Sequence, residues 1–288
     1  MLLRRPAQCF PLLCAAALFL LPRVFSQQAP SASAARILLL PRSVVSGERA
    51  TLAVLDANGR LTPGVTVSFS NGDRFTTDAT GRAMFVAPLN PGVIIGSILG
   101  RPGRVATTIL TPHEAATSFI EVSSAPRFAS LTDRFELAGR GFCGDADTNQ
   151  VSISGQRALV LASSPTSLVV LPPMELEPGR ASVGITCAKQ VAPPLKVVFV
   201  ALELEADSSP LAPGKHRSLT VHVRGTTSKV GLEARNLAPQ IAELTGGNPL
   251  RLSSSGGKEN LARFDLVGRK HGGFLISIRL LPSRTGPQ

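Results

Sequence analysis

The stretch that decides the fold opens with Phe135-Glu-Leu-Ala-Gly-Arg-Gly-Phe-Cys-Gly-Asp145. It continues through Val151-Ser-Ile-Ser-Gly155 and Ser167-Leu-Val-Val-Leu-Pro-Pro173, and it closes with Pro178-Gly-Arg-Ala-Ser-Val-Gly-Ile-Thr-Cys187. Short apolar runs separated by glycine and proline are typical of a small β-sandwich. We therefore predict one sandwich here, with a comparable sandwich on each side of it.

The flanking regions carry the strand signature most clearly. In two segments, apolar residues alternate strictly with polar ones, which places all the apolar side chains on one face of a strand. These apolar residues are Val65, Val67 and Phe69 in the first segment and Leu219, Val221 and Val223 in the second. The fold class predicted for the chain is all-β, with three tandem immunoglobulin-like β-sandwiches after a signal peptide.

The 288 residues suffice for two or three domains. The segment from Asn236 to Leu244 fits either a helix or a loop followed by a strand, and Pro239 weakens the helix. The predicted division is a signal peptide 1–26, a flexible lead-in 27–35, sandwiches 36–111, 124–196 and 197–282, a linker 112–123 and a loose tail 283–288.

The N-terminal segment has the pattern of a secretory signal. Arg4 and Arg5 precede an apolar run over residues 10–21, which is too short to span a bilayer comfortably. Cleavage is expected after Ser26 or after Ala34, and an uncleaved N-terminal anchor is the alternative. We expect an exported protein, in the periplasm, at the cell surface or outside the cell. No transmembrane span is expected in the mature chain.

Three turn-centred segments of the first sandwich resemble a known family. Leu55-Asp-Ala-Asn-Gly59, Pro63-Gly-Val-Thr-Val67 and Thr77-Asp-Ala-Thr-Gly-Arg-Ala83 resemble bacterial immunoglobulin-like domains of the invasin and intimin type, over about residues 36–111. Related modules also occur as carboxypeptidase-regulatory-like domains. This resemblance implies a spacer or adhesion role.

The central sandwich resembles a second family. Gly139-Arg-Gly-Phe-Cys143, the paired prolines Pro172-Pro173, and Pro178-Gly179 before the last strand resemble the IPT/TIG domain, over about residues 124–198. That domain has an immunoglobulin-like fold and occurs in receptors, transcription factors and bacterial secreted proteins. The C-terminal third of the chain resembles no family that we recognise.

Only Cys143 and Cys187 remain after removal of the signal peptide. A pair of cysteines in an exported chain predicts a disulfide, and two buried free thiols are the alternative. Two cysteines without a neighbouring histidine cannot make a four-ligand zinc site.

Three oxygen-bearing side chains, Asp145, Asp147 and Asn149, have the spacing of the first half of a calcium loop. However, Gln150 stands where that loop needs glycine, and Gln156 where it needs a bidentate glutamate. A surface turn is the favoured interpretation, and these residues are only weak metal candidates. We expect no cofactor.

No catalytic constellation is found, so we do not expect an enzyme. The first hypothesis is a non-catalytic spacer or interaction module that presents its sandwiches to a protein partner. The second is a module that binds an anionic polysaccharide or other polyanion of the cell envelope, and the third is a hydrolase with an unrecognised site. Nucleic acid is not expected as a partner.

Composition bears on the second hypothesis. Tyr and Trp are absent, which disfavours an aromatic platform for neutral glycans. Removing residues 1–26 takes away three arginines and no acidic residue, so the net charge falls from +11 to +8. The bases are scattered without a run of five, which favours an ordinary solvated surface over a polyanion site.

Overall fold

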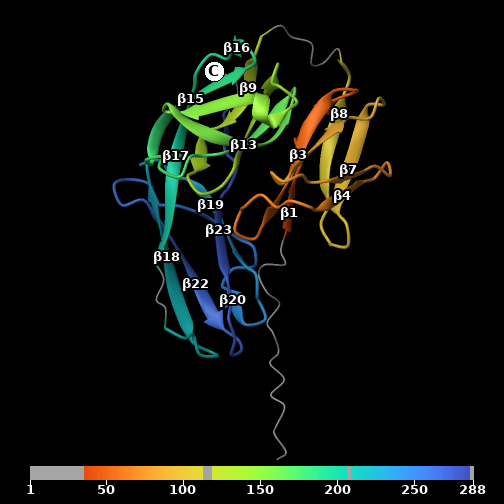
Figure 1. Ribbon diagram of the computed structural model, residues 1–288. Coiled ribbons are helices and arrows are strands. Elements are labelled where there is room, and N and C mark those ends of the chain that lie inside the picture. Colours follow the sequence, from red (N-terminus) through yellow and green to blue (C-terminus); the bar gives the residue numbers. More distant parts are fainter. Residues whose placement is uncertain (1–35, 113–118, 206–208, 286–288) are drawn as a thin grey trace, which may run out of the picture.

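The computed structural model describes residues 36–112, 119–205 and 209–285. Within these ranges strands make up nearly all the regular structure, and three large apolar cores follow one another along the chain. Figure 1 shows the first body in orange and yellow beside the second in green, with the third, in blue, below the second. The prediction of an all-β chain of three tandem immunoglobulin-like sandwiches is confirmed.

The first sandwich packs two sheets face to face. One contains β1 (Arg36–Leu39), β3 (Arg49–Asp56) and β6 (Arg82–Val86), with β3 in the middle. The other has the order β2 (Ser43–Val45), β8 (Val105–Leu110), β7 (Gly92–Ile98), β4 (Thr66–Phe69), β5 (Arg74–Thr76). The predicted alternation places Val67 and Phe69 in the core, where the Phe69 ring centroid lies 5.1 Å from that of Phe85.

The second sandwich contains the stretch from Phe135 to Cys187. One sheet has the order β9 (Glu121–Pro126), β11 (Phe135–Arg140), β14 (Ser167–Leu171), β13 (Gln156–Ser164). The other, the β15 sheet, contains β12 (Asn149–Ile153), β15 (Gly179–Cys187), β16 (Gln190–Val191), β17 (Leu195–Glu205) and β10 (Phe128–Ser130). β13 also pairs with β12, so this strand passes from one sheet to the other.

The third sandwich also has two sheets. The first has the order β17, β18 (His216–Arg224), β22 (Leu261–Gly268), β20 (Ala242–Leu244). The second, the β19 sheet, has the order β21 (Leu250–Ser253), β19 (Gly231–Asn236), β23 (Ile276–Leu280). Leu219, Val221 and Val223 lie in the core as their alternation predicts. Asn236 ends β19, and residues 237–244 form a loop followed by the short strand β20, which decides between the two expectations for this segment.

Strand β17 belongs to two sandwiches at once. Its first half pairs with β15 and its second half with β18. Val197 and Phe199 face the core of the second sandwich, whereas Val198, Val200 and Leu202, on the opposite face of the strand, pack into the third. The second and third sandwiches are therefore joined by continuous backbone hydrogen bonding, and the division expected at residue 197 falls inside this strand.

The first two sandwiches are joined by a buried contact. Leu39, Ala53 and Leu55 of the first form an apolar cluster with Leu161 and Ala162 of β13. Polar contacts surround the cluster: Thr51 Oγ1 donates to the Gly144 carbonyl at 2.9 Å, and Arg82 pairs with Asp147 at 2.7 Å.

Two expected boundaries are corrected by the structure. The loose tail was expected from residue 283, but β24 (Arg284–Thr285) pairs with β9, and Arg127 N–H donates to the Ser283 carbonyl at 3.0 Å. The expected linker is also shorter, because Ile120 is already buried in the second core. Residues 1–35, 113–118 and 286–288, which include the predicted signal peptide, lie outside the described residues. Within the described ranges, no helix is long and apolar enough to span a bilayer.

Candidate functional site

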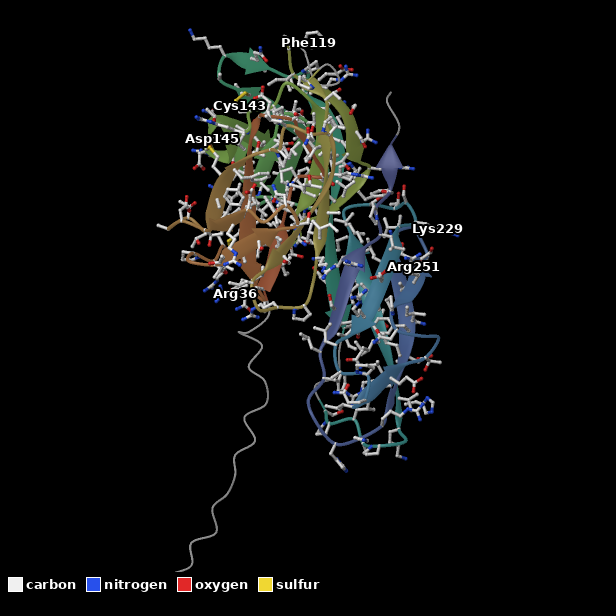
Figure 2. The ribbon with its side chains drawn as sticks, turned by 90° about the vertical axis from the view of Figure 1, so that its right-hand side faces the viewer. Arg36, Phe119, Cys143, Asp145, Lys229 and Arg251 are labelled. Atoms are coloured by element: carbon white, nitrogen blue, oxygen red, sulfur yellow. A yellow bond between two sulfur atoms is a disulfide. The ribbon has the colours of Figure 1, made fainter. Side chains whose placement is uncertain are left out.

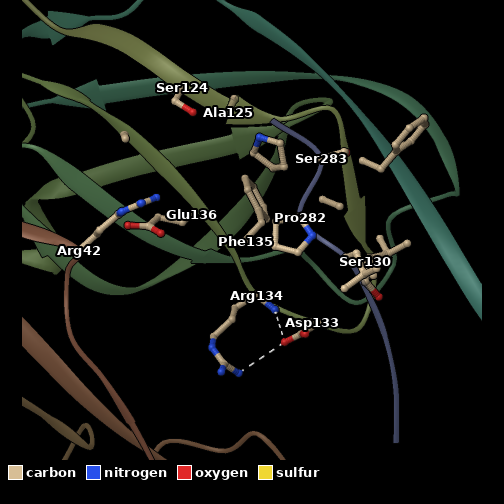
Figure 3. Close-up of a pocket in the computed structure, with 16 residues that line it drawn as sticks. Arg42, Ser124, Ala125, Ser130, Asp133, Arg134, Phe135, Glu136, Pro282 and Ser283 are labelled. Carbon is tan, nitrogen blue, oxygen red and sulfur yellow. Dashed lines mark hydrogen bonds and ion pairs between the residues drawn. The ribbon is translucent and has the colours of Figure 1, made fainter. Parts of the chain in front are cut away.

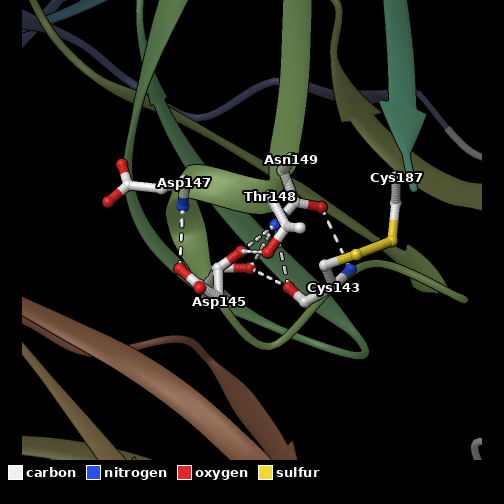
Figure 4. Close-up of a disulfide and its surroundings, with 7 residues drawn as sticks. Cys143, Asp145, Asp147, Thr148, Asn149 and Cys187 are labelled. Carbon is white, nitrogen blue, oxygen red and sulfur yellow. Dashed lines mark hydrogen bonds between the residues drawn. A yellow bond between two sulfur atoms is a disulfide. The ribbon is translucent and has the colours of Figure 1, made fainter.

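The predicted disulfide is confirmed. Cys143 and Cys187 are bonded, with their Cα atoms 5.7 Å apart (Figure 4). The pairing of β12 with β15 places Asn149 directly opposite Cys187. The Asn149 side chain in turn holds the loop that carries Cys143: its Oδ1 accepts from Cys143 N–H at 3.0 Å and its Nδ2 donates to the Cys143 carbonyl at 2.8 Å.

The three weak metal candidates have separate structural contacts. Asp145 Oδ1 accepts from Asp147 N–H at 3.0 Å and so caps the short 3-10 helix η2 (Ala146–Thr148). The Asp147 carboxylate pairs with Arg82 across the contact with the first sandwich. Asn149 is buried, and its amide is saturated by backbone groups and by Ser163. Among the described residues no group of three or more His, Cys, Asp and Glu side chains could hold a metal ion.

A strongly basic hollow lies where the second and third sandwiches meet. We call it the junction groove, and its volume is about 580 Å³. Its described lining contains no acidic side chain and four cationic ones, Arg127, Arg180, Arg224 and Lys258. The remaining lining residues are Phe128, Val198, Val223, Gly225, Thr226, Thr227 and Ser228.

The groove has a floor and a wall. The floor is the outward face of the β15 sheet, where Arg180 on β15 lies directly opposite Val198 on β17. The wall is the turn after β18, which begins at Gly225. A Cβ at Gly225 would lie 2.5 Å from the Phe199 carbonyl oxygen and 2.8 Å from Gly179 N, and its φ is +94°. Only glycine allows this turn to sit so close to the floor strands.

The wall is held in place by one buried amide. Asn260 Nδ2 donates to the carbonyls of Thr226 and Ser228, at 3.0 and 2.8 Å, and its Oδ1 accepts from Gly256 N–H at 2.8 Å. These bonds tie the turn that lines the groove to the loop that carries Lys258. The wall is therefore ordered before any ligand arrives, which reduces the entropy lost on binding.

The cations of the groove are largely unneutralised. Of the four, Arg224 alone has an ion pair with a described residue, Glu203 at 3.0 Å, and both side chains are exposed, so the pair contributes about 0–1 kcal/mol. The Arg127 guanidinium lies over the Phe128 ring, 5.1 Å from its centroid. Among the described residues no carboxylate lies within ion-pair distance of Arg127, Arg180 or Lys258. The groove is thus suited to a ligand with several negative charges.

A second pocket, of about 330 Å³, lies where the chain end returns to β9 (Figure 3). Its lining mixes Phe135 and Pro282 with two bases, Arg42 and Arg134, and two acids, Asp133 and Glu136. Asp133 accepts from Arg134 at 3.4 Å, and Glu136 accepts from Ser167 Oγ at 2.8 Å. The formal charges of its described lining therefore cancel, in contrast to those of the junction groove.

A further group of cations surrounds Glu233 on the outward face of the β19 sheet. The Glu233 side chain is only 4% exposed. Arg279 Nε donates to it at 3.0 Å, and Arg235 and Arg251 lie within 3.7 Å of its carboxylate oxygens. The hydrogen bond from Arg279 holds the pKa of the Glu233 carboxyl below its ordinary value; Arg235 and Arg251 act in the same direction, and burial opposes them.

Glu233→Gln is expected to lower the Tm at neutral pH, because three guanidinium groups lose their shared counter-charge. A carboxylate whose pKa is depressed in the folded state stabilises fully above the ordinary glutamate pKa of about 4.3, and its contribution is lost as the pH falls through the folded value. The Tm gap between wild type and variant, followed by calorimetry from neutral to acid pH, should therefore narrow on acidification. A gap that stays constant would contradict this role.

Sequence reasoning missed the junction groove. Arg127, Arg180, Arg224 and Lys258 are far apart in the chain and lie in no basic run, so the pattern favoured an ordinary solvated surface. The pairing of β17 with both β15 and β18 brings them together. The only local indication of the groove in the sequence was Gly225, which directly follows Arg224 at the end of the alternating strand.

The strand topology makes this a tandem immunoglobulin-like β-sandwich protein. No family model matches the chain, and no curated protein sequence matches it. The resemblances to invasin-type and IPT/TIG domains therefore stay predictions.

Among solved structures, the chain is similar to SGBP-B of the Bacteroides ovatus mixed-linkage glucan utilization locus, in complex with a mixed-linkage heptasaccharide (14% identity, covering 83% of this chain and 73% of that chain, TM-score 0.32). It is also similar to domains 1–6 of the surface layer protein SbsC (11% identity, covering 88% of this chain and 40% of that chain, TM-score 0.22). A third similar structure contains immunoglobulin domains 1–4 of Sidekick-1 (12% identity, covering 86% of this chain and 76% of that chain, TM-score 0.27). The chain thus spans two fifths of the SbsC chain. At these TM-scores the likeness does not indicate a shared function.

Proposed function

We propose that this protein is an exported, non-catalytic interaction module that binds an acidic polysaccharide in the junction groove. The observation that carries the proposal is the convergence of four cationic side chains on a groove whose described lining contains no carboxylate. Guanidinium groups bind carboxylates and sulfates through paired, charge-assisted hydrogen bonds. The hydroxyls of Thr226, Thr227 and Ser228 offer further polar contacts for sugar oxygens.

Export is supported by two independent features. The first is the signal-like pattern of residues 1–26, and the second is the disulfide, since such bonds persist in oxidising compartments and are rare in the cytosol. An exported protein meets the acidic polymers of the envelope and its surroundings. Chromosomal DNA is not among the ligands that such a protein would ordinarily encounter.

The class of polymer follows from what the groove lacks. Proteins that bind neutral sugars or single-stranded nucleic acids commonly stack them on exposed aromatic rings. The chain has no Trp or Tyr, and the aromatic residue that lines the groove, Phe128, is only 8% exposed. Charge and hydrogen bonding therefore dominate recognition, which favours an acidic polysaccharide. A protein partner, our first hypothesis from the sequence, stays a prediction.

The test is the affinity of the full mature chain for polygalacturonate, a linear polyuronate, measured by titration calorimetry. Arg180→Ala with Lys258→Ala is expected to weaken binding about tenfold or more, because two charge-assisted contacts are lost. Binding by the wild type should also weaken as salt is raised.

The matched control is Arg60→Ala with Arg74→Ala, which removes the same charge from two exposed sites on the first sandwich. This control should bind nearly as well as the wild type. Equal losses in both double variants would show that net charge alone drives binding and would remove the groove from the proposal. Absence of binding by the wild type would remove the polysaccharide and leave the protein partner.

A further inference from the structure

The basic surface does not end at the junction groove. On the outward face of the β15 sheet, Lys196 on β17 lies opposite Ser182 on β15. Ser182 is two residues after Arg180, so Lys196 and Arg180 lie on the same face in successive cross-strand pairs. Farther across the same sheet, Arg157 on β13 lies opposite Ser152 on β12. All three bases are exposed. Alternation thus places three cations in succession on the floor that leads into the groove.

The third sandwich covers one end of this floor and rises above it like a step. Lys196, Val198 and Val200 lie on the same face of β17, because side chains two positions apart point the same way. Val200 is buried in the core of the third sandwich, with Val198 packed against it. The β19 sheet therefore covers the continuation of the floor, and its outward face points in the same direction as the floor does.

The outward face of the β19 sheet, which is the top of this step, is basic as well. Arg251 and Arg279 lie directly opposite Glu233 on the two neighbouring strands. With Arg235, three guanidinium groups share one carboxylate, which leaves a net charge of +2 on this face. Arginine has five N–H donors, so each guanidinium keeps donors for a ligand after its contact with Glu233.

Lys229 connects the groove to the top. It is exposed and lies between Ser228, which lines the groove, and Val230, which precedes β19. In the view of Figure 2, Lys229 and Arg251 both lie along the right-hand side of the third sandwich. Lys229 and Glu233 are four residues apart along the chain, which corresponds to about 13 Å of extended backbone.

We infer that a linear acidic polysaccharide runs from the floor through the junction groove and over Lys229 onto the arginines of the β19 sheet, so that these arginines form a second subsite for longer chains. This inference rests on the proposed function of the groove. Two subsites on one polymer act cooperatively, because binding at the first raises the local concentration of the chain at the second. Affinity should therefore rise with polymer length beyond what the groove alone can hold.

The experiment compares a trigalacturonate with long polygalacturonate, using the full mature chain and titration calorimetry. Lys229→Gln with Arg251→Gln removes two exposed charges; Arg251 is 74% exposed, and Glu233 keeps its contact with Arg279. This variant is expected to bind the trimer as the wild type does and to bind the long polymer about tenfold more weakly. The groove variant, Arg180→Ala with Lys258→Ala, should lose affinity for both ligands.

Each other outcome is decisive. Unchanged affinity of the Lys229/Arg251 variant for the long polymer overturns the second subsite and leaves the groove intact. Loss of trimer binding in that variant, with an unchanged circular-dichroism spectrum, overturns the separation of the two subsites. If single-stranded DNA of equal charge binds the wild type as tightly as the polyuronate and loses affinity in the same variant, the surface does not discriminate in favour of acidic polysaccharide, and that part of the inference falls.

Discussion

Replacing Cys143 and Cys187 together with alanine is expected to lower the free energy of unfolding of the second sandwich by about 4 kcal/mol. The two cysteines are 44 positions apart, and in the chain-entropy model a cross-link that closes a loop of that size lowers the entropy of the unfolded state and so raises its free energy by about 4 kcal/mol. The folded state loses little packing, because Cys143 lies at the edge of the core and alanine retains the Cβ atom at both sites.

The measurement is calorimetry or circular dichroism, since the chain has no Trp or Tyr for fluorescence. For a domain of this size each kcal/mol corresponds to about 4–8 °C in Tm, so the shift is large. Reductant is the internal control: it should bring the wild type down to the Tm of the double variant and leave that variant unmoved. Equal melting of the wild type with and without reductant would show that the bond does not stabilise the fold.

The features that the sequence predicts well are those that a local pattern encodes. Val67 and Phe69 alternate with polar neighbours, and this period of two is enough to place them inside a sandwich. The turn at residues 56–60 is equally local: Asn58 and Arg60 donate their backbone N–H groups to Asp56 Oδ1, and Gly59 takes a φ of +77°. The disulfide follows from counting two cysteines in a chain whose N-terminal pattern predicts export.

The features that the sequence does not reveal depend on which strands become neighbours. Arg180 and Arg224 are in one groove because β17 pairs with β15 along one half and with β18 along the other. Nothing in the alternation of residues 195–205 says that the two faces of this strand bury themselves in different sandwiches. The pairing of β24 with β9 is equally hidden in the sequence, because it joins the first strand of the second sandwich to a strand that follows the third sandwich.

Gly144→Ala is the second large effect that we expect, and it tests the contact between the first two sandwiches. A Cβ at Gly144 would lie 1.9 Å from the Arg49 carbonyl oxygen, which belongs to the backbone and cannot rotate away. The variant must therefore separate the loop from β3 and break the Thr51 bond to the Gly144 carbonyl. We expect the free energy of unfolding to fall by about 1–3 kcal/mol, as for other overpacked sites.

The matched control is Gly273→Ala, where a Cβ meets nothing within 4 Å and the backbone φ is ordinary. Its free energy of unfolding should stay within about 0.5 kcal/mol of the wild-type value, as for a neutral surface substitution. In Gly144→Ala the first sandwich should unfold ahead of the rest, because the Leu39, Leu55 and Leu161 cluster opens to water and the two bodies no longer stabilise each other. Calorimetry should then resolve a transition at lower temperature that the wild type and Gly273→Ala lack. If Gly144→Ala instead melts as Gly273→Ala does, the first sandwich is not held against the second by this close backbone approach, and its orientation relative to the groove depends on the other contacts, among them the apolar cluster and the Arg82–Asp147 pair.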